Sequence, residues 1–134
     1  MKTAKIAKPV PAPVARLIGF RIVKTRKGAV TCELRAEKKH ENTIGTLHGG
    51  ILCDLSDAAM GYAFLTCLRP GQSGVTVEFK INFLKPVRAG DIVRASARAI
   101  SRGKSLYYLE CEMRNARKDL VAKAASTCKV AAGR

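Results

Sequence analysis

Apolar and polar residues alternate along much of this chain, and the alternation predicts a protein built mainly of strands. The clearest run is residues 75–83, where every second residue is apolar, which is the period of a half-buried strand. Weaker alternation elsewhere predicts further strands, separated by turns. Their expected bounds are 20–26, 29–36, 91–100, 106–114 and 120–130.

One stretch has a different period and predicts a helix. From Gly49 onwards, apolar residues recur three and four positions apart, which is helical spacing. They are Leu52, Leu55, Ala59, Tyr62 and Phe64 or Leu65. We expect this helix to end near residues 69–71, where Pro and Gly follow one another. A shorter helix is expected over residues 12–18, and residues 37–47 have no period and predict a loop.

A single long apolar helix beside antiparallel strands predicts an α+β domain whose sheet curls around the helix. The chain has 134 residues, enough for one domain with its own core. We interpret residues 1–8 as a basic flexible tail and residues 9–134 as that domain. The open edges of such a sheet favour pairing between copies, so a homodimer with a continuous sheet is expected.

The sequence predicts a cytoplasmic protein that neither spans nor binds a membrane. Its most apolar stretch, residues 51–68, is interrupted by Asp54, Ser56, Asp57 and Gly61, and no apolar run approaches the roughly eighteen residues of a membrane span. The N-terminal residues lack the apolar core of a signal peptide. The five cysteines are an odd number without zinc-ligand spacing, so reduced thiols and no metal are expected.

The net charge of +15 is unevenly distributed along the chain. Between His40 and Phe79 there is one base against four acids, and the other 24 bases lie in the two flanks. Such a charge attracts polyanions, either nucleic acid or a phosphate-rich molecule such as coenzyme A. Only seven Phe and Tyr residues occur, few for the aromatic stacking that RNA binding uses. Nucleic acid is therefore not expected as a partner.

Four chemically useful elements lie within sixteen residues, where the polar loop enters the long helix. They are Asn42, His48, the pair Gly49-Gly50, and Asp57. Backbone N–H groups at a helix start stabilise a developing oxyanion, and glycine lets a substrate approach the backbone closely. A carboxylate on an apolar helix is a candidate general base or nucleophile. The segment predicts a site for attack on a carbonyl group.

Each of these residues also has a purely structural interpretation. Asn42 is a common turn former, and His48 is a candidate for ordering the loop. Asp57 on its own could be an ordinary exposed helix residue, and Asp54 is a rival carboxylate that we expect in the first helical turn, stabilised by the helix dipole. Cys53 is close to His48, yet a cysteine on an apolar helix is expected to be an inert apolar residue.

The order of elements and the motif N-x5-HGG-x6-D resemble the hot-dog-fold thioesterases, and most closely their PaaI-like, phenylacetate-pathway branch. The resemblance extends from about residue 14 to residue 130. Three segments carry it: ARLIGF, TLHGGILCDLSDAAMGYA and GVTVEFKINFLKPVRAGDIV. It implies a curved antiparallel sheet around one helix, dimers that pair into homotetramers, and no metal or separate cofactor.

The resemblance also implies an activity, hydrolysis of acyl- or aryl-coenzyme A, in which coenzyme A is part of the substrate. The implied catalytic residues are Asn42, His48, the oxyanion-hole Gly49, Asp57 as base or nucleophile, and Thr76 on the strand after the helix. Thr76 is implied to act across a dimer interface, although a plain strand residue is the alternative. The expected substrate-binding residues are Gly50 beside the thioester, Tyr62 in the acyl pocket, and three bases for the phosphates: Arg88, Arg102 and Lys104.

Other functions fit the sequence less well. A non-catalytic hot-dog module that binds acyl-coenzyme A is the main alternative to the enzyme. A hot-dog hydratase needs a different arrangement of Asp and His, and no histidine follows His48. Nucleic-acid binding gives Asp57 no role. The sequence leaves open the acyl group and the choice between a general base and a covalent anhydride.

Overall fold

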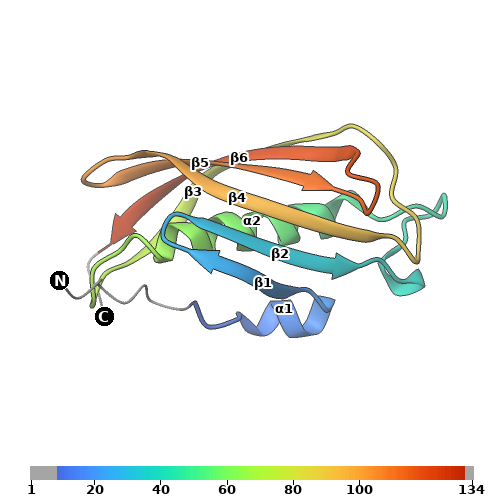
Figure 1. Ribbon diagram of the computed structural model, residues 1–134, viewed down its shortest axis with the longest axis horizontal. Coiled ribbons are helices and arrows are strands. Elements are labelled where there is room, and N and C mark those ends of the chain that lie inside the picture. The colour runs from blue at the N-terminus through green and yellow to red at the C-terminus, as the bar shows by residue number, and fades with distance from the viewer. Residues whose placement is uncertain (1–8, 132–134) are drawn as a thin grey trace.

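A long helix, α2 (Gly49–Leu65), lies against the inner face of a curved antiparallel sheet in the computed structural model, which describes residues 9–131 (Figure 1). The sheet has six strands in the order β1-β2-β4-β5-β6-β3. Their bounds are β1 Arg21–Arg26, β2 Ala29–Arg35, β3 Ser73–Phe83, β4 Ile92–Arg102, β5 Leu106–Arg114 and β6 Leu120–Ala131. The expected α+β architecture is thus observed, and the predicted tail, residues 1–8, lies outside the described residues.

The core forms between α2 and the sheet because α2 turns its large apolar residues inward. Leu55, Ala59, Met60 and Ala63 are completely buried, at the three- and four-residue spacing that the sequence indicated. Burial of each large side chain contributes on the order of 1.5–3 kcal/mol to stability. The opposite face of α2 carries Asp57 and remains exposed, which leaves its carboxylate accessible.

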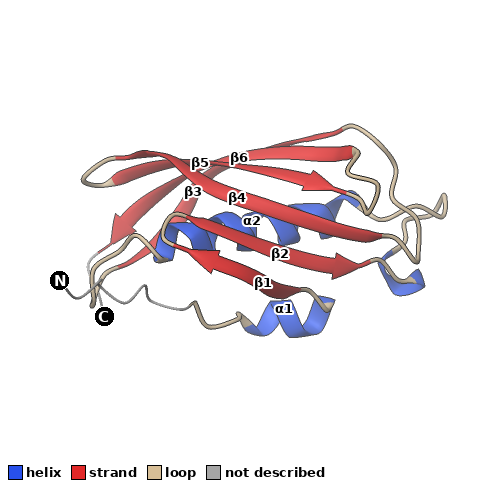
Figure 2. Cartoon of the chain, in the orientation of Figure 1, coloured by secondary structure: helices blue, strands red, loops and turns tan. Residues whose placement is uncertain are grey.

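A short helix, α1 (Pro13–Ile18), lies beside β1 at one edge of the sheet (Figure 2). It begins with Pro at its first position and ends at Gly19, whose φ of 102° is the left-handed conformation that glycine adopts readily. The backbone N–H of Ala12, just before α1, donates to the Tyr62 hydroxyl at 2.9 Å. This bond fixes the start of α1 onto α2.

The loop predicted over residues 37–47 contains a short 3-10 helix, η1 (Lys38–His40). His40 is buried, and its ring nitrogens contact the Glu37 N–H at 3.0 Å and the Ile18 carbonyl at 2.7 Å. Its own carbonyl accepts the His48 N–H at 2.8 Å. His40 therefore joins three segments and anchors the residue that begins α2.

The long helix ends earlier than expected, at Leu65 rather than near residues 69–71. The Thr66 hydroxyl donates to the Ala63 carbonyl at 2.6 Å and accepts the Gly28 N–H at 2.7 Å. After Leu65 the backbone N–H groups of Cys67 and Leu68 bond to carbonyls three residues back. The contact with the β1–β2 turn thus tightens the last turn and ends the helix before Pro70 is reached.

β3, whose sequence alternates most clearly, does not keep this alternation along its whole length in the structure. A register shift between Thr76 and Glu78 interrupts the pairing of β3 with β6, and such a bulge moves side chains to the other face. Thr76 pairs with Cys128, which is buried, whereas Val75 and Val77 are 59% and 53% exposed. Thr76 itself is exposed, and its hydroxyl faces α2, where it bonds to Asp57.

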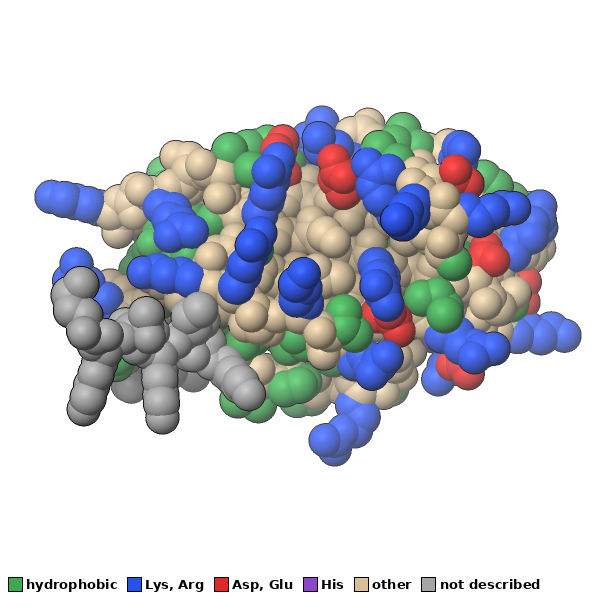
Figure 3. Space-filling model, viewed as in Figure 1, with side chains coloured by type: hydrophobic (Ala, Val, Ile, Leu, Met, Phe, Trp, Pro, Cys, Tyr) green, Lys and Arg blue, Asp and Glu red, His purple; other side chains and the backbone are tan. Residues whose placement is uncertain are grey.

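Basic side chains cover the outer face of the sheet (Figure 3). On β4, Arg94, Ser96 and Arg98 are exposed while the residues between them are buried, as the sequence indicated. Arg94 and Arg98, two bases of the C-terminal flank, therefore lie on this face, opposite α2. Among residues 9–131, no helix is long and apolar enough to cross a membrane.

Candidate active site

The loop before α2 and the first turn of α2 form one half of the candidate site. His48 is the N-cap residue, with an extended backbone, and its Nδ1 accepts the Gly50 N–H at 2.9 Å. An Nδ1 that accepts a hydrogen bond leaves the ring proton on Nε2 in the neutral imidazole. The exposed His48 ring thus caps the helix, the loop-ordering role that the sequence offered, and can still donate from Nε2.

Gly49, the first residue of α2, has a backbone N–H without a hydrogen-bond acceptor among the described residues. The helix dipole reinforces this donor. A side chain at Gly49 would come within 2.8 Å of the Phe83 ring, and one at Gly50 within 2.9 Å of His48 Nδ1. A side chain at either position would therefore require a neighbouring side chain to shift, and the Gly49 N–H is available to an oxyanion.

The side chain of Asn42 is used within its own loop. Its Oδ1 accepts the N–H groups of Ile44 and Thr46 at 3.0 and 3.1 Å, and its Nδ2 donates to the Thr46 hydroxyl at 2.8 Å. This arrangement is an Asx-type turn, the structural alternative noted for this residue. Asn42 also lines the hollow that contains Gly49, so it shapes the site by holding the loop.

Asp57 and Thr76 form the other half of the candidate site. The Thr76 hydroxyl donates to Asp57 Oδ1 at 3.0 Å, and the Cys128 thiol lies 3.7 Å from the same hydroxyl. The pairing links the exposed face of α2 to β3 within one chain. A role of Thr76 towards a partner subunit remains a prediction.

The neighbouring carboxylate, Asp54, is not in the first turn of α2, which contains no acidic residue. Our expectation of dipole stabilisation is therefore wrong for Asp54. Burial, and then the nearby charge of Asp57, raise its pKa above the ordinary range. Burial, Asp54 and Asp57 also raise the pKa of the Cys53 thiol. A protonated thiol is a poor nucleophile, in agreement with an inert Cys53.

The two halves face different hollows in a single chain. Gly49 lines a hollow of about 450 Å³ with Asn42 and Phe83, whereas Asp57 and Thr76 line a cavity of about 260 Å³ with Tyr62. Asp57 follows Gly49 by eight positions along α2, which is about 12 Å at a rise of about 1.5 Å per residue. One chain therefore does not bring both groups to the same carbonyl.

The predicted substrate-binding residues are similarly divided. Tyr62 lines the cavity beside Asp57 together with Phe64 and Leu65, the apolar lining that the sequence indicated. Arg88 lies near the hollow of Gly49, since both border Lys85 and Pro86. Arg102 contacts the turn at Gly28, which adjoins the C-terminal end of α2. Lys104 lies in the β4–β5 turn, just after Arg102, the last residue of β4. The three bases therefore do not form one cluster in a single chain.

Three residues at the site were not singled out from the sequence. Phe83 covers Gly49, Cys128 touches Thr76, and His40 anchors His48. An apolar residue at the end of a strand and a cysteine on a strand have the pattern of core residues, so no local signal marks them. Of the three, only His40 has a local signal in the sequence, because it is a histidine eight positions before His48.

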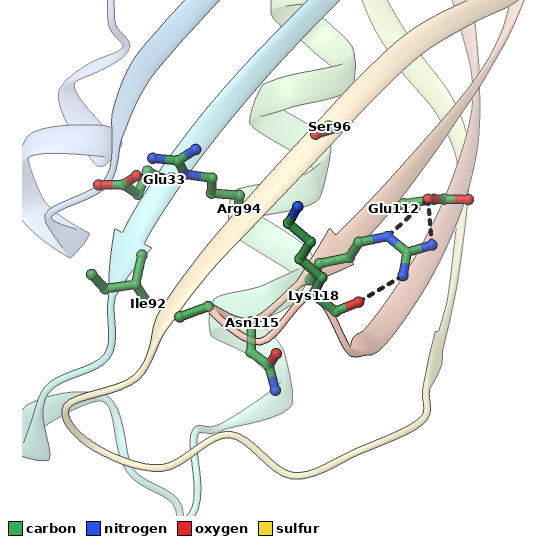
Figure 4. Close-up of a pocket in the computed structure, with 9 residues that line it drawn as sticks. Glu33, Ile92, Arg94, Ser96, Glu112, Asn115 and Lys118 are labelled. Atoms are coloured by element: carbon green, nitrogen blue, oxygen red, sulfur yellow. Dashed lines mark hydrogen bonds and ion pairs between the residues drawn. The ribbon is translucent and has the colours of Figure 1, made fainter.

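A larger hollow, of about 550 Å³, lies on the outer face of the sheet (Figure 4). Its carboxylates are paired: Glu33 accepts from Arg94 at 2.8 Å and from Arg21 at 3.2 Å, and Glu112 accepts from Arg114. It contains none of the predicted catalytic residues. We interpret it as a salt-bridged part of the sheet surface.

This network gives a stability prediction. The hydrogen bond from Arg94, and secondarily that from Arg21, lower the pKa of Glu33. The ionised Glu33 therefore contributes to the free energy of unfolding at neutral pH, and this contribution is lost as the pH falls through the folded-state pKa. We expect Glu33→Gln to lower the free energy of unfolding by about 1 kcal/mol at pH 7. Urea unfolding at pH 7 and pH 3 measures this. A difference from the unaltered chain that is equally large at pH 3 would contradict it.

Comparison with known proteins identifies the family of the chain. Residues 44–122 match the family model of the thioesterase superfamily. Human acyl-coenzyme A thioesterase 13 is 34% identical over 101 residues, which cover 75% of this chain and 71% of the human protein.

Two solved structures are similar over most of the chain. The PaaI protein of the Escherichia coli phenylacetic acid degradation operon superposes with a TM-score of 0.86 at 26% identity, covering 91% of this chain and 86% of that one. A Streptococcus mutans protein bound to acetyl CoA has a TM-score of 0.80 at 30% identity, covering 86% and 90%. These similarities confirm the hot-dog fold and the PaaI-like resemblance expected from the motif.

Proposed function

The chain belongs to the thioesterase superfamily, and from this premise we propose that it hydrolyses the thioester bond of acyl- or aryl-coenzyme A to the free acid and coenzyme A. The observation that carries the proposal is a helix with an unoccupied N–H at Gly49 and an exposed carboxylate at Asp57. The name of the human relative and the acetyl CoA bound to the Streptococcus mutans protein support this substrate class.

Gly49 and Asp57 have different roles in the proposed reaction. The Gly49 N–H and the helix dipole stabilise the negative charge that develops on the thioester oxygen. Asp57 either takes a proton from the attacking water or attacks the carbonyl itself. In the first case the water oxygen bonds to the carbonyl carbon, the carbon–sulfur bond breaks, and the thiolate takes up the proton that Asp57 removed from the water. In the second case the carboxylate oxygen bonds to the carbonyl carbon and the thiolate leaves; water then hydrolyses the resulting anhydride, which releases the free acid, restores Asp57 and supplies the proton for the thiolate. Thr76 holds Oδ1 of Asp57, which aims the carboxylate.

The separation of about 12 Å along α2 requires a second copy of the chain. In the proposed dimer, Gly49 of one protomer faces Asp57 and Thr76 of its partner. The strand β3 lies at an edge of the sheet, so two β3 strands pairing antiparallel would satisfy each other's edge backbone groups and set two α2 helices antiparallel. Association of dimers into a homotetramer remains a prediction from the resemblance, and a cytoplasmic location remains a prediction from the sequence.

The alternative, a non-catalytic module that binds acyl-coenzyme A, uses the same cavities but makes no use of an activated carboxylate. Turnover separates the two functions. We expect the chain to release free thiol from at least one of phenylacetyl-, hydroxybenzoyl-, hexanoyl- and palmitoyl-coenzyme A, measured with a thiol reagent. Binding of these esters without thiol release would replace the enzyme by the binding module.

A further inference from the structure

Thr76 holds the carboxylate of Asp57, but the position of its own hydroxyl is not secured by burial. Thr76 is exposed on the edge strand β3, next to the register shift between Thr76 and Glu78. A hydroxyl at such a place can turn to any of its staggered positions, and the others face water or backbone. A second contact that fixes this rotation would therefore define the 3.0 Å bond to Asp57 Oδ1.

The thiol of Cys128 makes such a contact. Cys128 lies directly opposite Thr76 on β6, and its Sγ is 3.7 Å from the Thr76 hydroxyl oxygen. Cys128 is only 1% exposed and belongs to the core, yet it also lines the cavity beside Asp57. Burial raises the pKa of this thiol, so it keeps its hydrogen at neutral pH. A firmly packed donor thus lies beside the Thr76 hydroxyl.

The hydrogens of this group determine the direction of each bond. An ionised Asp57 only accepts, so its contact uses the single hydroxyl hydrogen of Thr76. The Thr76 oxygen can then only accept from Cys128, whose S–H is a weak donor. The Ser126 hydroxyl donates to Met60 Sδ at 3.3 Å and lies 3.9 Å from Cys128 Sγ. The Cys128 hydrogen therefore goes to the nearer oxygen, that of Thr76.

This chain of contacts is anchored in the core at its other end. Ser126 is 2% exposed and Met60 is completely buried. Ser126 and Cys128 are two positions apart on β6, so both side chains point to the same face of the sheet. Met60 follows Asp57 by three positions on α2. The contacts thus begin on the buried side of α2, pass through β6 and β3, and return to the exposed carboxylate.

Resting on the proposed function, we propose that Cys128 is a positioning residue whose thiol keeps the Thr76 hydroxyl turned towards Asp57. The other polar groups around the cavity do not hold Thr76. Asp54 lines the cavity without a bond to Thr76 in the described residues, and the Tyr62 hydroxyl accepts the Ala12 N–H. A carboxylate that is less well aimed slows the reaction without weakening substrate binding. Loss of the thiol should therefore lower kcat and leave KM nearly unchanged.

Replacing the thiol tests this role. We expect Cys128→Ala to lower kcat for the best coenzyme A ester by about three- to tenfold, the effect of one lost hydrogen bond, with KM changed by less than about twofold. Cys128→Ser keeps a donor and should lose less than Cys128→Ala. Cys32→Ala is the matched control, because Cys32 is equally buried but lies on β2, which β4 and β5 separate from β6. It should keep kcat within about twofold.

A double-mutant cycle separates positioning from packing. Thr76→Val keeps the shape of the side chain and removes its hydroxyl, so the Cys128 thiol has nothing left to hold. Adding Cys128→Ala to Thr76→Val should then lower kcat by less than a further twofold or so. A thiol that only fills the core would cost the same with either residue at position 76. Circular dichroism and size-exclusion chromatography verify that each variant is folded and assembled.

The outcomes separate this inference from the proposed function. An unchanged kcat in a folded Cys128→Ala variant, an equal loss in Cys32→Ala, or an equal loss in the Thr76→Val background would overturn the role of Cys128 and leave the enzyme intact. If Cys128→Ala does not fold, Cys128→Val fills the same space without a donor and takes its place. If the unaltered chain hydrolyses no ester, the proposed function is wrong and the role of Cys128 falls with it.

Discussion

Asp57→Asn should lower kcat/KM for the best coenzyme A ester by about two to four orders of magnitude, while the fold is retained. Asparagine has the shape of aspartate and still accepts the Thr76 hydroxyl at Oδ1, so the 3.0 Å contact between α2 and β3 persists. It cannot take a proton from water or attack a carbonyl. Asp57 is exposed, and its replacement therefore costs little stability. Thiol release and thermal unfolding measure the two effects.

The matched control is Asp54→Asn, which removes the same charge from the same helix one turn earlier. Asp54 lines the same cavity but is not bonded to Thr76 in the described residues. We expect this variant to retain activity within a few-fold, since its carboxylate is not aimed by a second residue. Comparable losses in both variants, or more than a tenth of the activity left in Asp57→Asn, would exclude Asp57 as base or nucleophile.

The arrangement of elements was predictable because it follows from side-chain period. Residues 106–114 alternate in the sequence and form β5 with the expected bounds. The start of α2 at Gly49 was equally predictable, since a capping residue, two glycines and helical spacing all coincide there. The positions of His48 and Gly49 at this helix start follow from the same local signals, whereas the division of the site between two hollows does not.

Other features depend on contacts between distant segments, which a local pattern does not contain. The Thr76 hydroxyl faces α2 beside the bulge in β3, a contact that the alternation of residues 75–83 does not indicate. The end of α2 depends on the contact of Thr66 with Gly28. The position of the segment before α1 depends on a hydrogen bond from Ala12 to Tyr62. Asn42 was correctly recognised as a possible turn former, but only its three hydrogen bonds show that its amide is occupied.

The other half of the proposed site gives the second large effect. Gly49→Pro removes the N–H assigned to the oxyanion, and we expect kcat to fall by about 10²–10³. Proline is tolerated at the first position of a helix, and the extended His48, with ψ of 131°, suits a residue before proline. Gly49→Ala is the control: it adds the same Cβ against Phe83 but keeps the N–H, so it should lose less than about tenfold. Equal losses would show that only the contact with Phe83 matters.

Mixing the two inactive chains then tests whether two protomers build each site. An Asp57→Asn chain still supplies Gly49, and a Gly49→Pro chain still supplies Asp57. In a symmetric dimer with one site at each end of the interface, a mixed pair contains one complete site and one without either group. Co-expression in equal amounts makes half of the dimers mixed, so about a quarter of the unaltered activity should return. Mixed dimers that form and stay inactive would place both groups in one chain, against the separation of about 12 Å along α2.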